Sequence, residues 1–467
     1  MTPPIPTSSA GGADLASLGA GLGRAASAGF QAYLWGYPLV VMRRTRELLT
    51  APGGPGAPLN TFRHGPRLLT HRDRAVVRPN NDTLYSSAWL DLSAGPVVLE
   101  VPDLDDRYFS FQLMDAYTNS WAYVGRRTTG TAAQRHVIAG PSWRGDCPPG
   151  AQLLRSPTPT VWLLGRTVVG EDDLPAVRHL ITQYRLEPLA DPGAGTAAAG
   201  AAGAGGGRPS PAEPAEPAAP APGGAGGRRS PHEVSSAGVE LFDELGVAMA
   251  ENPPPAADAA VVEALAEMGI GPGAAPVASR AGLAGSDGLA AGLAAGQRFL
   301  EASRLAGGKA VNGWSYDLDI GAYGTDYLLR AKVARYGLGA LHPEEALYAQ
   351  PVRGHQELIG ARRWRLVFAA GQLPPVDAFW SLTAYGPDGF LVDNPIGRYS
   401  IGDRTPGLAR ERDGSLVVRI QHDEPAEGPG NWLPVPEGRF DLSLRFYQPT
   451  AELLEGRYQI PPLVEAD

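Results

Sequence analysis

Cysteine and lysine are almost missing from this 467-residue chain. Cys147 is the single cysteine, so no disulfide forms within the chain and zinc sites built from cysteines are excluded. Lys309 and Lys332 are the two lysines, and arginine supplies the other positive charges. The net charge of −9 at pH 7, with no long Lys/Arg cluster, argues against a nucleic-acid partner.

Long apolar runs and several enzyme motifs are missing as well. No stretch has the length of a membrane span, and residues 1–23 lack the basic start and apolar run of a signal peptide. We therefore expect a soluble cytoplasmic protein with no membrane partner. There is no G-x-S-x-G, no H-E-x-x-H and no lysine-containing P-loop. The histidines are scattered, so we expect neither a metal nor another cofactor.

Composition and periodicity predict several domains in a chain of this length. Strands of alternating pattern between turn residues fill 74–170 and 363–448, which predicts a mainly β protein with helices and two antiparallel β-sandwiches. Pro38 is expected to break or kink an N-terminal helix. The predicted parts are a disordered tail (1–13), a helix plus β-sandwich (14–187), a flexible Ala/Gly/Pro-rich linker (190–231), a helical segment (232–310), and a helix plus jelly-roll-like sandwich (311–467).

Hydrogen-bonding side chains gather in the segment RPNNDTLYSSAWLDL, residues 78–92. Asn81 and Asp82 belong to a turn that leads into an alternating strand, where Tyr85 shares a face with Trp89. These polar groups either lock the turn or face a ligand.

A second group of polar side chains shares one face of the helix predicted within YGTDYLLRAKVARYGLGAL. Tyr323, Asp326, Tyr327 and Arg330 follow the i, i+3, i+4, i+7 spacing, and Asp326 and Arg330 are placed to form an ion pair. Two phenols and a fixed ion pair suit the wall of a polar pocket. The alternative is a helix that packs on a sheet through these same groups.

Three further segments offer candidate ligand-binding residues. In RYFSFQLMDAYTNSW, Gln112 needs a partner if it is buried, while Asp115 and Asn119 either face a site or cap a turn. Arg398 either binds a carboxylate or phosphate or holds its own loop through Arg–Asp pairs. Trp380 is either a stacking platform or a core residue.

The longest motifs resemble two bacterial families of unknown function. RPNNDTLYSSAWLDL, DDRYFSFQLMDAYTN and GPSWRG resemble DUF1254, and YGTDYLLRAKVARYGLGALHPEEALY, PPVDAFWSLTAYGPDGFLVDNPIGRYSIGDR and NWLPVPEGRFDLSLRFYQP resemble its usual partner, DUF1214. The resemblance implies two β-sandwiches, the second jelly-roll-like, with helices between them, and it implies no established reaction. Many relatives look exported, and this chain departs from them by lacking a signal peptide.

Three functions remain open on these observations. In the first, the protein is a metal-independent hydrolase or lyase that binds a small molecule in a cleft between the β-domains. Asp82 or Asp115 would be the general acid/base, and Tyr85 and Tyr327 would be proton donors. Arg330 or Arg398 would bind an anionic group of the substrate. The second is a non-catalytic protein that binds a glycan or apolar ligand. The third is a structural protein, and a homo-oligomer is compatible with each.

Overall fold

The computed structural model describes residues 11–74, 78–170, 172–189, 237–277, 283–303, 308–352, 354 and 357–466. The predicted linker and residues 1–10 of the predicted tail lie outside these ranges. The first helix, α1 (Gly11–Thr50), begins inside the predicted tail, so residues 11–13 are helical and that part of the prediction is wrong. The helix also continues through Pro38 and does not end there.

The first β-sandwich consists of two packed sheets. One sheet has the order β1 (Arg63–His64), β2 (Thr83–Asp91), β8 (Thr160–Val168), β4 (Phe109–Asp115) and β5 (Ser120–Gly125). The other has the order β7 (Gln152–Arg155), β6 (Gln134–Ala139), β3 (Val97–Val101) and β9 (Arg185–Pro188). Leu84, Leu99 and Leu163 meet in the core between the sheets, and α2 (Leu174–Ile181) adds Val177 to it.

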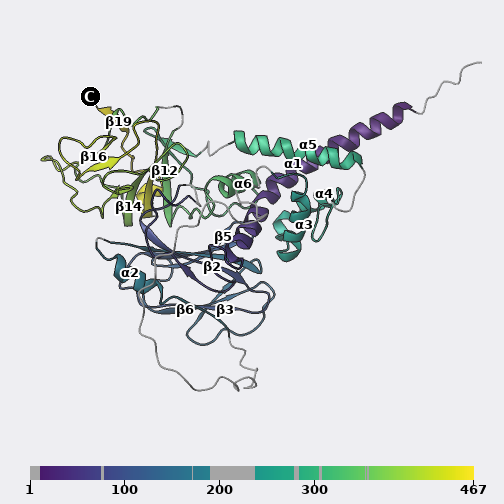
Figure 1. Ribbon diagram of the computed structural model, residues 1–467. Helices are drawn as coiled ribbons and strands as arrows, with labels where there is room; N and C mark the ends of the chain where they lie inside the picture. The colour runs from purple at the N-terminus through teal and green to yellow at the C-terminus, as the bar shows by residue number, and fades with distance from the viewer. Residues whose placement is uncertain are drawn as a thin grey trace, which may run out of the picture.

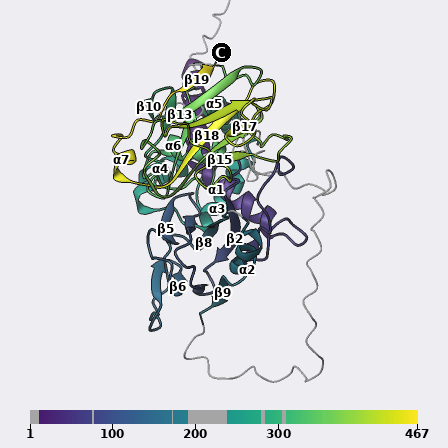
Figure 2. The same cartoon turned by 90° about the vertical axis from the view of Figure 1, so that its left-hand side faces the viewer.

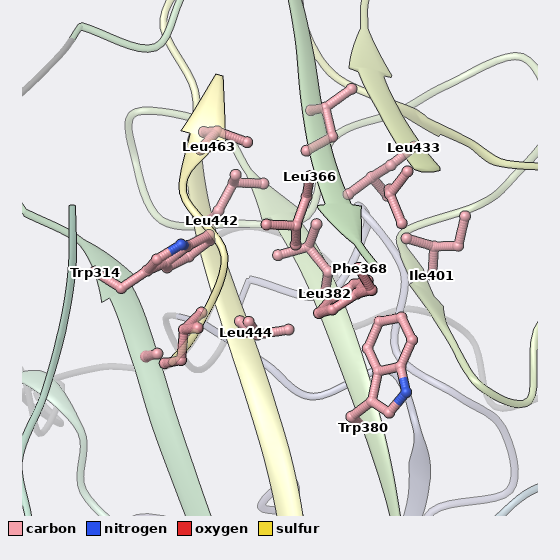
Figure 3. Close-up of a cluster of buried hydrophobic side chains, with 14 of the residues drawn as sticks. Trp314, Leu366, Phe368, Trp380, Leu382, Ile401, Leu433, Leu442, Leu444 and Leu463 are labelled. Atoms are coloured by element: carbon pink, nitrogen blue, oxygen red, sulfur yellow. The ribbon is translucent and has the colours of Figure 1, made fainter. Parts of the chain in front are cut away.

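The second β-sandwich also pairs a large sheet with a small one. The large sheet has the order β10 (Lys309–Val311), β11 (Trp314–Tyr316), β12 (Ala346–Pro351), β18 (Asp441–Pro449), β14 (Val376–Tyr385) and β15 (Ser400–Gly402). The small sheet has the order β17 (Trp432–Pro434), β16 (Leu416–Gln421), β13 (Arg363–Phe368) and β19 (Leu463–Ala466), and α7 (Ala451–Leu454) follows β18. Figure 3 shows side chains of both sheets in the shared core, among them Leu366, Leu382 and Leu444.

The mainly β fold with two sandwiches and accompanying helices is confirmed. The sheets are not wholly antiparallel, however, because β6 pairs with β7 and β16 pairs with β17 in parallel. The jelly-roll order of the second sandwich stays a prediction. Figures 1 and 2 show the second sandwich above the first, and Figure 1 shows most of the helices to one side of them.

The helices form a layer with a core of its own. Its members are α1, α3 (Leu241–Glu251), the 3-10 turn Ala256–Asp258, α4 (Ala259–Ala266), α5 (Leu283–Ala302) and α6 (Tyr327–Tyr336). Tyr33 and Trp35 of α1 pack with Phe242 of α3 and Leu293 of α5 in this core. Met42 of α1 packs on the outer face of the first sandwich against Met114 of β4 and Trp162 of β8. Val168 of β8, on the same face, packs against Phe379 and Tyr447 of the second sandwich. The helical layer and the second sandwich together therefore cover this face, and every residue of β4 and β8 is buried.

Candidate functional site

A pocket of about 190 Å³ lies where the two sandwiches meet α6. The first sandwich contributes Tyr85 from β2 and Arg166 from β8, and the second contributes Tyr348 from β12 and Arg445 from β18. One face of α6, the loop 337–340, residues 78–80 and part of the segment 315–320 also line it. Three parts of the chain that are distant in sequence therefore meet around one space.

Strand alternation turns the pocket residues away from the sandwich cores. Leu84 and Ala88 of β2 enter the first core, so Tyr85 between them points to the outer face of its sheet. Leu444 and Phe446 of β18 enter the second core, which directs Arg445 outward in the same way. The pocket thus joins the outer faces of two sheets whose inner faces hold the hydrophobic cores.

Each pocket arginine lies beside a tyrosine of the neighbouring strand. Tyr85 is the cross-strand partner of Arg166, whose guanidinium carbon lies 5.6 Å from the centre of the Tyr85 ring. Tyr348 is the cross-strand partner of Arg445. Cross-strand neighbours of this kind stay in contact because the ladder fixes their register. The two sheets therefore present similar Arg–Tyr pairs to one pocket.

Neutral acceptors orient both guanidinium groups. Arg166 donates through Nη1 to Oε1 of Gln112 at 3.0 Å and through Nη2 to the carbonyl oxygen of Gly339 at 2.7 Å. Arg445 donates through Nη1 to Oγ1 of Thr383 at 2.7 Å and through Nη2 to the Tyr385 hydroxyl. Hydrogen bonds to neutral groups fix these side chains but leave their positive charges uncompensated.

The loop 337–340 depends on a glycine at its centre. Gly339 has a φ of +83°, in the left-handed region, and a Cβ built there would lie 3.2 Å from a methyl carbon of Leu164. The Gly339 carbonyl holds Arg166, and the Ala340 carbonyl accepts a hydrogen bond from Nε2 of Gln112. The backbone after α6 is thereby bound to the first sandwich beneath the pocket.

The phenols of Tyr348 and Tyr447 are neutral at ordinary pH. Burial raises the pKa of Tyr348, and it raises the pKa of Tyr447, another lining residue, well above the usual value. A neutral phenol can donate or accept a hydrogen bond but supplies no negative charge. The pocket therefore combines fixed positive charge with neutral hydroxyl groups.

The polar turn before β2 binds the two sandwiches together. The Asp82 carboxylate accepts hydrogen bonds from Oγ of Ser381 at 2.7 Å and from Nη2 of Arg404 at 3.1 Å, both in the second sandwich. Asn81 donates to the carbonyl oxygen of Leu69. Asp82 is 4% exposed, so its two partners hold the carboxylate inside the domain interface. Of the residues predicted here, Tyr85 is the one that lines the pocket.

Asp115 and Asn119 cap the turn between β4 and β5, as one of the two interpretations of the sequence expected. Oδ1 of Asp115 accepts hydrogen bonds from the backbone N–H groups of Tyr117 at 2.8 Å and Asn119 at 2.9 Å. The Asn119 amide donates to the same carboxylate. Gln112, on β4, accepts a hydrogen bond from Arg166 and so fixes the position of its guanidinium group. Neither Asp115 nor Asn119 contributes to the pocket wall.

Asp115 predicts a pH dependence of stability. Burial raises its pKa from 3.8 to about 6, although the turn and Arg330 oppose the rise. The native state therefore keeps a proton that the unfolded chain releases, so this group's contribution falls as pH rises from about 4 to about 6. Relative to the wild type, we expect the unfolding free energy of Asp115→Asn to rise by about 2 kcal/mol between pH 4 and pH 7. Urea unfolding at both pH values measures this gain, and an unchanged difference would contradict it.

The polar face predicted for α6 belongs to a buried cluster outside the pocket. Arg330 lies 3.6 Å from the Asp258 carboxylate and donates to the carbonyl oxygen of Trp35, while Tyr327 donates to Oδ1 of Asp258 at 3.0 Å. Asp326 instead caps the helix by accepting from the backbone N–H of Leu329. The predicted Asp326–Arg330 ion pair is therefore wrong, because Asp326 precedes the helix and Arg330 pairs with another segment.

The remaining candidates also lie away from the pocket. Tyr323 is buried and its backbone N–H donates to Oδ1 of Asn119. Trp380 is 2% exposed and lies in the core of the second sandwich (Figure 3). Arg398 donates to the carbonyl oxygens of Gly430 and Trp432, so its guanidinium holds neighbouring loops through backbone groups.

Four residues that line the pocket were not predicted from the sequence: Arg166, Arg445, Tyr348 and Lys332. A signal existed for the first two. Arg166 lies in the apolar segment TVWLLGRTV and Arg445 lies in LSLRFYQP, where a charged residue occupies an otherwise hydrophobic or aromatic strand. Such a residue requires a polar environment if the strand is buried. The distant elements that meet it are not visible in the local pattern.

Among the described residues, no group of three or more His, Cys, Asp or Glu side chains could hold a metal ion. Within the same ranges, no helix combines the length and apolar character needed to cross a membrane.

Fold and site together define a protein of two β-sandwiches that share a pocket with a helical layer. Residues 59–188 match the family described as "Protein of unknown function (DUF1254)", and residues 345–451 match "Protein of unknown function (DUF1214)". The chain is a DUF1254/DUF1214 domain-containing protein, as its motifs predicted.

Two solved structures resemble this chain over most of its length. The VPA0106 protein from Vibrio parahaemolyticus has a TM-score of 0.66 and 23% sequence identity, covering 95% of this chain and 100% of that one. An uncharacterised protein from Burkholderia cenocepacia has a TM-score of 0.45 and 14% identity, covering 97% of this chain and 96% of that one. The likeness to the Vibrio protein supports the shared fold. No curated protein matches this chain.

Proposed function

We propose that this protein binds a small organic molecule in the pocket between its two β-sandwiches and α6. The observation that supports this most directly is the composition of the wall. Leu329, Val333 and Leu338 form an apolar side, and a few fixed polar groups converge from the two sheets. Ligand sites are commonly concave, largely apolar and placed between domains, with a small number of polar groups that orient the ligand.

The proposal is tested by filling the pocket. Gln350 is a half-buried lining residue on β12, and Gln350→Trp would occupy the ligand's volume. A ligand found in a thermal-shift panel of small organic molecules should raise the Tm of the wild type. At a ligand concentration of 100 times Kd, its binding adds about 2.7 kcal/mol to the free energy of unfolding. The same ligand should have no effect on Gln350→Trp, while the free proteins melt at similar temperatures.

The matched control places the same substitution away from the pocket. Gln459 is exposed in the second sandwich domain, so Gln459→Trp should respond to the ligand as the wild type does. A ligand that stabilises Gln350→Trp as strongly as the wild type binds elsewhere, and this result would remove the support for a pocket function.

A metal-independent hydrolase or lyase is the second candidate, and Tyr85 is the observation that favours it. Tyr85 was selected as a proton donor from the sequence, and it lines the pocket beside Arg166. Asp82 and Asp115 are engaged in the domain interface and in a turn, so proton transfer would fall to the pocket phenols. Turnover that Tyr85→Phe abolishes without loss of ligand binding would favour this candidate. A cytoplasmic location belongs to the same proposal.

A further inference from the structure

We propose that the ligand of this pocket carries an oxyanion, a carboxylate or a phosphate, which Arg166 and Arg445 bind. The inference rests on the proposed function and names its ligand class. It comes from the ion pairing of the buried charged residues, which is independent of the pocket's shape.

Most buried ions in the described residues have a counterion. Arg44 pairs with Glu244, Arg330 with Asp258, Glu345 with Arg127 and Asp82 with Arg404. Burying a charge without a partner is costly, so such pairing is the general expectation. Asp115 has no ion pair, but its carboxylate accepts hydrogen bonds from the backbone N–H groups of Tyr117 and Asn119, and the charge of Arg330 acts on it at longer range.

Arg166 and Arg445 depart from this pattern. They are 6% and 4% exposed, yet among the described residues neither forms an ion pair with an aspartate or a glutamate. Asp82 acts on Arg445 at longer range, but its carboxylate is already bonded to Arg404. An arginine cannot relieve the cost of burial by losing its proton. Two buried, permanently charged groups therefore share one pocket without a protein counterion.

The other charged residues of the wall have the same sign. Arg78 and Lys332 also line the pocket, and Asp317 is the single carboxylate among the lining residues. Arg78 pairs with Asp441, but its Nη1 is buried without an acceptor. The wall is thus strongly basic in a chain whose net charge is −9. A negatively charged ligand would compensate these groups, whereas a neutral ligand would leave them unpaired.

The N–H donors that the two arginines leave unused suit an oxyanion better than a simple halide ion. Arg166 uses two of its five N–H donors in hydrogen bonds to the protein. Arg445 donates to Thr383, Tyr385 and the Arg78 carbonyl through Nη1 and Nη2, and none of these bonds uses its Nε. Guanidinium groups bind carboxylates and phosphates through paired N–H donors. The Tyr348 phenol lies within electrostatic reach of both guanidinium groups and can donate to the same oxygens. The apolar face of α6 then favours an anion with a hydrocarbon body.

The experiment compares anions with neutral molecules of the same length. Hexanoate, hexyl phosphate, hexanamide and hexanol are titrated into the full chain by calorimetry, with thermal shift as a second readout. We expect one of the two anions to bind the wild type at least about tenfold more tightly than the neutral pair. The better anion identifies the carboxylate or the phosphate as the preferred group.

Charge-removing variants locate the binding. Arg166→Gln and Arg445→Gln should each reduce the preference for the anion to about threefold or less. Arg412→Gln removes an exposed arginine outside the pocket and should keep the full preference. If one pocket variant fails to fold, the other still tests the inference, since each arginine is held by a different sheet.

Three results would overturn the inference. The first is equal binding of the anions and the neutral molecules by the wild type, which leaves the proposed pocket intact. The second is an anion preference that survives in both pocket variants. The third is that neither anion binds the wild type, while a neutral ligand from the panel stabilises the wild type but does not stabilise Gln350→Trp. If no molecule of any kind binds, the proposed function fails together with the inference.

Discussion

Arg330→Met is expected to lower the free energy of unfolding by about 3–5 kcal/mol. Arg330 is 1% exposed and is the cation facing Asp258, which is itself 1% exposed. Removing the guanidinium leaves the Asp258 carboxylate buried with the hydroxyl of Tyr327 and the indole N–H of Trp35 as its remaining partners. Urea unfolding followed by circular dichroism measures the loss.

A surface ion pair provides the control for this prediction. Arg362 and Glu465 are both about half exposed, so Arg362→Met should cost no more than about 1 kcal/mol. In the double variant Arg330→Met/Asp258→Asn, part of the loss should return, because the unpaired carboxylate is gone. A loss below 1 kcal/mol for Arg330→Met alone would mean that the cluster of α1, α6 and the 3-10 turn is not a closed interior.

Trp380→Ala is expected to destabilise the protein by about 3–5 kcal/mol, because it removes a large side chain from a packed core. The Trp380 ring lies 5.0 Å from that of Phe368, and β14 and β13 bring the two rings together from opposite sheets (Figure 3). The sequence left open whether this residue is a stacking platform for a glycan. Chemical denaturation of Trp380→Ala, compared with the milder Trp380→Phe, separates these roles.

The two interpretations of Trp380 give opposite results. A core residue produces a large loss of stability in the alanine variant and an intermediate loss in the phenylalanine variant. A ligand platform produces near-normal stability with loss of saturable ligand binding. The second pattern would contradict the position of Trp380 inside the sandwich.

The strands were predictable where alternation is strong, and the site was not. The pattern around Leu84 and Ala88 predicts both the strand β2 and the outward direction of Tyr85, because the side chains of a strand alternate between its two faces. Short strands such as β9 and β17 carry no such period, since three or four residues are too few to show one.

Long-range pairing explains the remaining misses. The spacing of four residues predicted an ion pair between Asp326 and Arg330. Asp326 caps the helix instead, and the counterion of Arg330 is Asp258, which comes from another segment. Arg166 and Arg445 meet in the pocket only because two separate sheets turn their outer faces to α6. Local spacing describes one element at a time and cannot state which elements pack together.

The position of α1 has a consequence for folding during synthesis. The strands of the first sandwich form one continuous stretch from Arg63 to Pro188, so this domain can fold as soon as it has left the ribosome. The helix α1 precedes it, but the partners of α1 are α3, α5 and α6, and α6 ends at Tyr336. At roughly 5–20 residues per second, tens of seconds separate α1 from its last partner. Trp35 can contact Tyr117 of the first sandwich early, but Tyr33 and Val40 gain most of their native neighbours only when α3, α5 and α6 have been made. We therefore expect part of the apolar surface of α1 to stay exposed on the nascent chain during that time.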